Sequence, residues 1–372
     1  MCNKKKLLIT TICATLTLGC VLVFSGCGKK DKASETATST EETVESGEAE
    51  ESEDGTLRSL LSNEPIEDAS LVENRPIAIM YENTKAALPH YGLSNAKVVY
   101  QATVEGSITR IMALFDDYSG MDKIGCVRSA RPYYAYTAAE YNAIYIHFGQ
   151  SINTEGLLTS FTGHLVEDIN FIFDSHYYRD NSRQAPHNAY TSSELIDEAI
   201  EAKGYERKQS DDYKEGHFKF AKDENLLEDG EDCVVLTTYY PHDQPWFVYD
   251  EDSQTYARYE FGAPHVDQAN GEQLTFTNII YMNVHQELYP GDKGYLNIPI
   301  AGASGTGKFF TRGKMVDITW SSGGDGQVTH YYYMDGTEIE LNTGKTFVSL
   351  IQNEKVDENH FYATYEDYEA NK

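Results

Sequence analysis

Arginine and histidine side chains that could bind an anion gather in one part of this 372-residue chain. Six of the ten arginines lie between Arg75 and Arg183, although the formal net charge of the whole chain is −29. The planar guanidinium group matches carboxylates and phosphates, so convergence of these residues would form a local anion pocket. The candidate ligand-binding residues are Glu105, Arg110, Arg128, Ser129, Arg131, His147, Arg183, His187 and Asn188.

Two other interpretations of the same residues stay open. Nearby acids could pair with the arginines as structural ion pairs, namely Glu105, Asp116, Asp117, Glu140 and Asp180. Alternatively, Glu105 or His147 could act as acid or base in an envelope hydrolase or transferase, with Arg128 and Arg131 stabilising developing negative charge. A Cys126 nucleophile with His147 as base is a weaker idea, because single cysteines are usually packed apolar residues.

Residues 302–308, Gly-Ala-Ser-Gly-Thr-Gly-Lys, match most of a phosphate-binding P-loop pattern. Phe309 occupies the position at which that loop needs Ser or Thr, and residues 310–313 do not open a helix. We interpret the segment as a glycine-rich turn in a β-rich region. Other catalytic motifs and zinc-ligand spacings are not recognisable in the sequence, so we expect neither a cofactor nor a metal.

The elements around the arginines alternate between strand and helix. Apolar, β-branched content predicts strands over residues 76–81, 97–102, 108–115 and 143–148. Residues 132–141 are typical of a helix with proline in its first turn, and residues 191–194 form a capping box that opens a helix ending at Lys203. These patterns predict an α+β or α/β N-terminal domain over residues 71–210.

Beyond Gly204 the pattern changes to short β runs separated by turns. Strands are predicted over residues 233–239, 246–249, 256–261, 275–284, 315–320, 328–334 and 346–351. Asp335-Gly336, between two such runs, indicates a hairpin. We therefore expect a mainly antiparallel β domain over residues 211–372.

The N-terminus has the features of a bacterial lipoprotein signal peptide. Three lysines at positions 4–6 precede an apolar stretch over residues 7–24, and Ser25-Gly26 precede Cys27. We expect a signal peptide over residues 1–26 and a lipid on Cys27; Cys20 is a poorer candidate. The alternative is a transmembrane anchor of about 18 residues, near the lower limit for spanning. Residues 27–70 are predicted to be a disordered tether, since residues 28–56 contain ten acidic residues and lack aromatic ones.

Charge and location restrict the partners. Removal of three signal-peptide lysines changes the formal charge from −29 to −32, which excludes nucleic acid as a favoured partner. We expect attachment to the outer face of the cytoplasmic membrane through the lipid on Cys27, and binding of an anionic envelope glycan or peptide. Outside the signal peptide and the lipid site, Cys126 and Cys233 could form one disulfide or remain two buried thiols.

Several motifs resemble the YerB-like family of bacterial lipoproteins over roughly residues 70–355. They are residues 75–80 with Glu82-Asn83, 92–94, 104–110, 127–132, Arg183 with 185–188, 249–250, 256–258, 265–267, 318–320 and 341–346. The resemblance implies a lipoprotein signal, a disordered tether and two distinct domains, without an established activity. Cys126 stands where similar chains tend to have proline, which weakens a catalytic role for that thiol.

Overall fold

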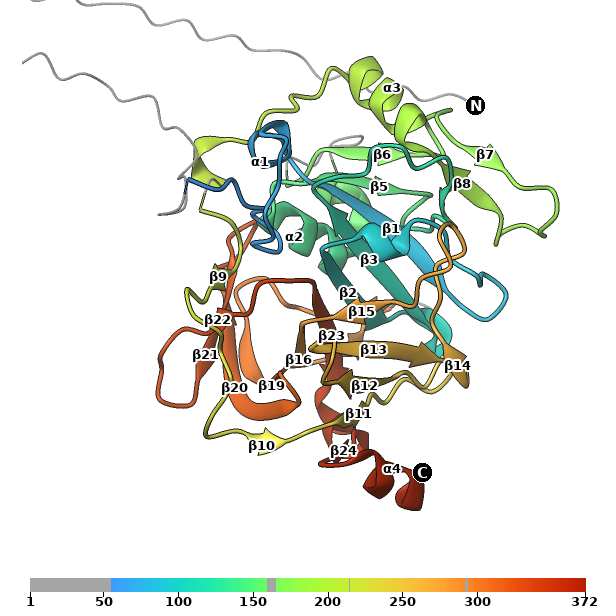
Figure 1. Ribbon diagram of the computed structural model, residues 1–372. Helices are drawn as coiled ribbons and strands as arrows, with labels where there is room; N and C mark the ends of the chain where they lie inside the picture. The colour runs from blue at the N-terminus through green and yellow to red at the C-terminus, as the bar shows by residue number, and fades with distance from the viewer. Residues whose placement is uncertain (1–54, 159–164, 214, 292–293) are drawn as a thin grey trace, which may run out of the picture. The chain divides into compact units, whose positions relative to one another are not determined.

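The computed structural model describes residues 55–158, 165–213, 215–291 and 294–372 (Figure 1). These belong to one compact unit, Gly47–Lys372. The predicted signal peptide, Cys27 and residues 28–54 of the predicted tether lie outside the described residues. The last part of that tether is not disordered as predicted, because Leu61 is buried in the core and Ile66 N donates to Leu57 O (2.9 Å). Within the described ranges, the helices are all too short or too polar to cross a membrane.

An eleven-stranded sheet forms the centre of this unit (Figure 1). Its main order is β10-β20-β19-β16-β23-β2-β3-β1-β5-β6, and β21 pairs with β20. The bounds are β1 Ile77–Asn83, β2 Val98–Thr103, β3 Thr109–Phe115, β5 Ile144–His147, β6 Asp168–Asn170, β10 Glu231–Asp232, β16 Asn278–Val284, β19 Ser304–Thr311, β20 Lys314–Ser322, β21 Thr329–Tyr333 and β23 Thr346–Gln352. Strand β23 runs parallel to both β2 and β16, so strands from the two halves of the chain share one sheet.

Smaller sheets and short helices surround the large sheet. A six-stranded sheet contains β11 Val235–Thr237, β12 Trp246–Asp250, β13 Thr255–Glu260, β14 Ala263–Pro264, β15 Thr275–Phe276 and β24 Phe361–Tyr362. The remaining strands are β4 Ile124–Gly125, β7 Tyr178–Arg179, β8 Ala189–Thr191, β9 Lys219–Phe220, β17 Glu287–Leu288, β18 Leu296–Asn297 and β22 Glu340–Leu341. The helices are α1 Ser70–Glu73, α2 Pro132–Glu140, α3 Ser193–Lys203 and α4 Tyr365–Asn371, with 3-10 turns η1 Leu93–Asn95, η2 Glu105–Ser107, η3 Ile152–Leu157, η4 Asp211–Tyr213 and η5 Asn353–Glu358.

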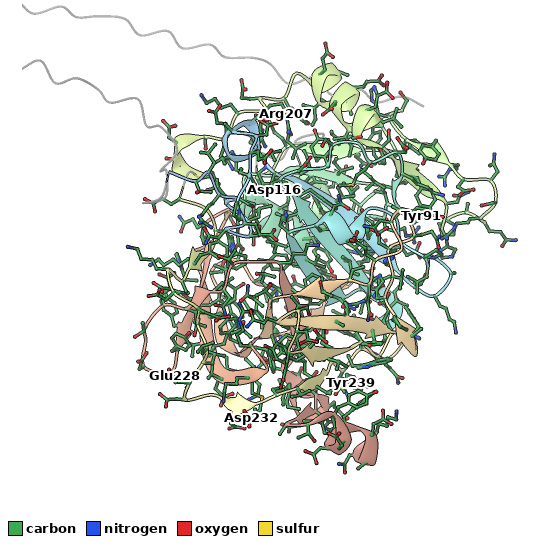
Figure 2. All side chains as sticks on the ribbon, in the orientation of Figure 1. Tyr91, Asp116, Arg207, Glu228, Asp232 and Tyr239 are labelled. Atoms are coloured by element: carbon green, nitrogen blue, oxygen red, sulfur yellow. The ribbon has the colours of Figure 1, made fainter. Side chains whose placement is uncertain are left out.

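Both faces of the central sheet are buried, because successive strand residues point to opposite faces. On one face, Ala78 and Met80 of β1 pack in a core that includes Tyr134 of α2. On the other, Ile79 packs in a core that includes Ile200 of α3 and residues of the six-stranded sheet. Side chains fill the space between these layers (Figure 2). Burial on both faces explains the nearly continuous apolar runs in these strands.

The predicted fold class is confirmed: a mixed α+β N-terminal part precedes a largely antiparallel β part. Two local predictions were wrong. Helix α3 is capped by Ser192, whose hydroxyl accepts from Leu195 N, one residue later than the predicted box. Residues 304–308 belong to strand β19, between β16 and β20, and the turn follows at Arg312-Gly313, where φ is positive. The domain boundary after residue 210 stays a prediction.

Candidate functional site

Three of the predicted arginines form a cluster beside the end of β1. Arg110 is the second residue of β3, directly opposite Glu82 of β1. The segment that carries Arg128 and Arg131 lies beside β1, because Arg128 N donates to Met80 O (2.9 Å). Two residues further on, Ala130 N donates to Gly149 O (2.9 Å). The Arg110 guanidinium donates to Ser129 O at 2.7 Å. We call Arg110, Arg128 and Arg131 the arginine cluster.

Two members of the arginine cluster have carboxylate partners. Arg131 contacts Glu105 through both Nε and Nη2, and Arg128 Nε lies 3.3 Å from Glu82 Oε2. Burial raises the pKa of Glu105, but the hydrogen bonds and charge of Arg131 outweigh this, so the pKa lies below its ordinary value. Glu105 is therefore suited to hold Arg131 as a carboxylate, and poorly suited to donate a proton near neutral pH.

Arg110 is buried, and no carboxylate among the described residues forms an ion pair with it. It is 5% exposed, and its Nε has no hydrogen-bond partner among the described residues. Burial, followed by the charges of Arg131 and Arg128, lowers its pKa to about 10. Among the described residues, the cluster thus holds three guanidinium groups and two carboxylates, a local excess of positive charge inside a strongly acidic protein.

His187 joins the site from the loop between β7 and β8. Its Nδ1 lies 2.8 Å from Oε1 of Glu82, the same carboxylate that pairs with Arg128. The Glu82 side chain is 2% exposed, whereas Arg128 and His187 are 20% and 28% exposed. Arg128 and His187, two of the predicted residues, therefore both contact the same buried Glu82 carboxylate. Sequence reasoning missed Glu82 as a site residue, although Glu82-Asn83 is a polar pair that ends an apolar strand.

The other predicted residues support the loop that carries His187. The Arg183 guanidinium donates to the carbonyls of Ala87 and Leu88 (2.7 and 3.1 Å). Asn188 is buried; its side chain accepts from Arg179 (2.7 Å) and donates to Arg183 O (3.3 Å). Arg183 and Asn188 therefore position the loop, while Ser129 contributes its carbonyl to Arg110.

His147 is buried apart from the exposed part of the site. Its Nδ1 lies 2.8 Å from Gly149 O and its Nε2 lies 3.1 Å from Asp168 Oδ2, and both side chains are 0% exposed. Because both ring nitrogens face oxygen atoms of the protein, neither is directed at a ligand. Glu105 is instead partly exposed and paired with Arg131, so the structure does not bring Glu105 and His147 together as an acid–base pair facing one ligand.

Cys126 and Cys233 are two free, buried thiols, which decides between the two possibilities for these cysteines. Burial raises the pKa of Cys126 to about 11, although the charges of Arg128 and Arg183 act in the opposite direction. Burial also raises the pKa of Cys233 to about 12. Since the thiolate is the nucleophile, neither cysteine is activated at neutral pH.

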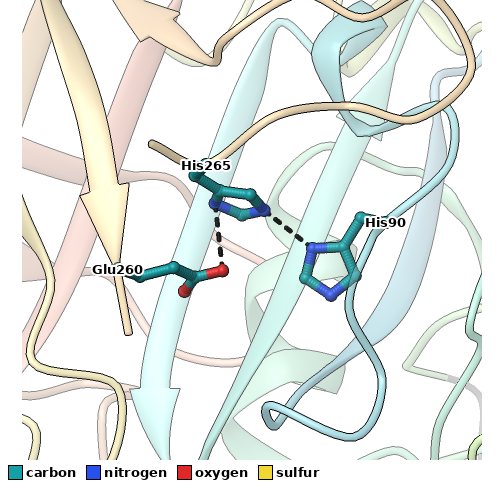
Figure 3. Close-up of side chains that lie close together, drawn as sticks. All are labelled: His90, Glu260 and His265. Atoms are coloured by element: carbon teal, nitrogen blue, oxygen red, sulfur yellow. Dashed lines mark hydrogen bonds and ion pairs between the residues drawn. The ribbon is translucent and has the colours of Figure 1, made fainter. Parts of the chain in front are cut away.

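A second polar cluster lies beneath this region and links the two halves of the chain (Figure 3). His90 Nε2 lies 2.6 Å from Glu82 O, and His90 Nδ1 lies 2.9 Å from His265 Nε2. The guanidinium of Arg258 contacts His265 Nδ1. Arg258 can only donate and the Glu82 carbonyl can only accept, so these partners fix the direction of the hydrogen bonds between them. Arg258 donates to His265, His265 donates to His90, and His90 donates to the Glu82 carbonyl. Burial lowers the pKa values of His90 and His265, as expected for two neutral rings.

The donor atoms of His90, Glu260 and His265 lie within 4.8 Å of one another, as in a metal site. The Arg258 guanidinium, however, already contacts His265 and lies 3.0 Å from Glu260 Oε2. A metal ion would be repelled by this buried positive charge, and the facing ring nitrogens of the two histidines already hydrogen-bond each other. We therefore interpret the cluster as a hydrogen-bonded connection between the halves.

The sequence and fold define a two-part family of proteins of unknown function. Residues 61–206 match the N-terminal domain of the DUF3048 family, "Protein of unknown function", and residues 235–348 match its C-terminal domain. The chain belongs to this family, as the YerB-like resemblance predicted.

A relative in Bacillus subtilis (strain 168), named "Putative lipoprotein YerB", is 28% identical over 287 residues, which are 76% of this chain and 83% of the relative. The crystal structure of YerB from Bacillus subtilis superposes with a TM-score of 0.71 and 26% identity. The superposition covers 82% of this chain and 99% of that one.

Proposed function

We propose that this protein is a lipid-anchored envelope protein that binds an anionic ligand, a phosphate-bearing glycan or a peptide carboxylate, at the arginine cluster. The lipid would be attached to Cys27, in agreement with the Ser25-Gly26-Cys27 pattern and with the name of the Bacillus relative. This arrangement would hold the folded unit at the extracytoplasmic face of the membrane.

The buried Arg110 guanidinium is the observation that carries the proposal. A buried charge is costly unless it is paired, and here two like charges stand beside it. An anion at the exposed Arg128 would offset this repulsion without having to reach Arg110 itself. Arg128 and His187 are partly exposed, so they would contact the ligand, while Glu82 and Glu105 hold Arg128 and Arg131 in position.

The Arg128→Lys variant tests the proposal. Lysine keeps the charge but loses the paired donors of the guanidinium, so the affinity for a glycerol-phosphate oligomer should fall roughly tenfold, with little change in melting temperature. The matched control is Arg312→Lys, which changes an arginine that pairs with Glu224 outside the cluster. Equal affinities of the parent and Arg128→Lys would contradict the proposal. So would a variant that is less stable than the parent, if the parent itself binds no anion.

A further inference from the structure

The C-terminal half contains a cavity of about 380 Å³ over strands β16, β19 and β20. This volume falls within the range of about 300–1,000 Å³ that is usual for small-molecule sites. Thr306, Gly307 and Lys308, from the segment that resembles a P-loop, line it. The residues that line the cavity lie apart from the arginine cluster in sequence, and a ligand in the cavity would not need an anion at that cluster.

Cross-strand pairing explains which side chains line the cavity. Tyr281 of β16 is opposite Lys308 of β19, and Lys308 is opposite Asp317 of β20. Residues directly opposite each other lie on the same face, and so do residues two positions further along each strand. Asn283 and Thr306 therefore continue the same face, and Asn283 Nδ2 donates to Thr306 Oγ1 at 3.0 Å.

Charge on this surface is balanced. Lys308 and Asp317 are the charged residues among the described ones that line the cavity, and Lys308 Nζ lies 2.6 Å from Asp317 Oδ1. A pair of opposite charges favours neither an anion nor a cation. Lys308 is thus not a free phosphate-binding lysine, although it lies in a P-loop-like sequence.

The remaining polar atoms are a mixture of donors and acceptors. The Lys308 ammonium has three N–H groups, Asp317 has a second oxygen, and Asn283 keeps its amide oxygen after donating to Thr306. Beside them lie the Phe361 ring and Met334, which is 66% exposed. A sugar ring matches this combination. Its adjacent hydroxyl groups both donate and accept hydrogen bonds, and its C–H faces are apolar.

We propose that this cavity binds an uncharged sugar unit of an envelope glycan. Asp317 and Lys308 would bind hydroxyl groups on one edge of the sugar, Asn283 and Thr306 would bind those further along the strands, and Phe361 would contact a C–H face. The sheet supplies the platform because three adjacent strands hold these side chains in fixed rows.

Two neutral tetrasaccharides, chitotetraose and maltotetraose, are the probes. The full-length protein is purified in a detergent without a sugar headgroup, and each probe is titrated by calorimetry and by saturation-transfer NMR. At least one should bind saturably, and Asp317→Ala should weaken that binding about tenfold, as expected for loss of a hydrogen bond to a charged group.

The matched control is Asp232→Ala. Asp232 lies on β10 (Figure 2), and its pair with Lys314 resembles that of Asp317 with Lys308, because the two aspartates are 68% and 66% exposed. Asp232→Ala should leave the affinity unchanged. Failure of both sugars to bind saturably, or equal loss in the two variants, would overturn the proposal. So would saturable binding of inorganic phosphate that is lost in Lys308→Ala, because the cavity would then be an anion site.

Discussion

Replacement of Asp243 by Asn should remove a pH dependence of stability that the fold itself creates. Asp243 is buried, and one of its oxygens, Oδ2, accepts hydrogen bonds from Gln101, Asn83 and Thr109, at 2.5, 3.0 and 3.1 Å. Its other oxygen has no hydrogen-bond partner among the described residues. Burial and then the charge of Glu260 raise the pKa of Asp243 from 3.8 to about 7, against the opposing effect of Arg258.

The direction follows from proton binding. The folded state binds the Asp243 proton more tightly than the unfolded state, so this stabilisation is complete below pH 3.8 and is lost as pH rises to about 7. The difference of 3.2 between about 7 and 3.8, at 1.36 kcal/mol per unit, corresponds to roughly 4 kcal/mol at neutral pH. Asparagine keeps the shape and one acceptor oxygen but cannot ionise, so Asp243→Asn should be more stable than the parent at pH 8.

Thermal unfolding of both proteins at intervals between pH 5 and pH 8 measures this difference. About two units of the pKa difference lie between pH 5 and about 7, so the melting temperature of the parent should fall relative to that of Asp243→Asn by roughly 4 °C, as estimated for a folded unit of this size. Asp317→Asn, at an exposed carboxylate, controls for the loss of one negative charge. Parallel curves for the parent and Asp243→Asn would refute the reasoning, because Asp243 would then not be the group that binds the proton.

Two further predictions concern the anion site and the anchor. Arg110→Met should stabilise the protein by about 1–3 kcal/mol in urea unfolding, because it replaces a buried charge, for which the described residues provide no ion pair, by an apolar side chain; a destabilised variant would show that Arg110 is satisfied within the fold. Cys27→Ala should move the protein from the membrane to the soluble fraction or leave an unprocessed precursor, and a processed product that still sediments with membranes would contradict lipidation at this position.

The sequence was sufficient to predict the strands whose apolar pattern is continuous. Strands β1, β2, β3 and β5 lie within one or two residues of their predicted bounds, because they are buried on both faces. Strand β19 was missed, since residues 304–308 contain only small and polar side chains; pairing with β16 and β20 on both sides holds it as a strand. Insertion of β23 between β2 and β16 leaves no local pattern, because its pairing with β2 joins residues more than 200 positions apart in the sequence and its pairing with β16 joins another distant segment.

The candidate site was only partly accessible from sequence. Clustering of arginines in an acidic chain indicated Arg110, Arg128 and Arg131, and the structure brings these together. Residue type could not distinguish His187, which is partly exposed and contacts the buried Glu82 carboxylate, from His147, which is enclosed with Asp168. That distinction depends on burial and partner geometry, which arise only when distant strands pack.

The location of a bound anion tests the central claim most directly. Crystals of the protein soaked in selenate, a sulfate analogue with an anomalous signal, should show a peak within hydrogen-bond distance of the Arg128 guanidinium and close to His187. The same soak of Arg128→Lys crystals should give a much weaker peak at that position. A parent structure with selenate bound elsewhere, and with Arg128 still paired only to Glu82, would contradict the assignment of the arginine cluster as the anion site.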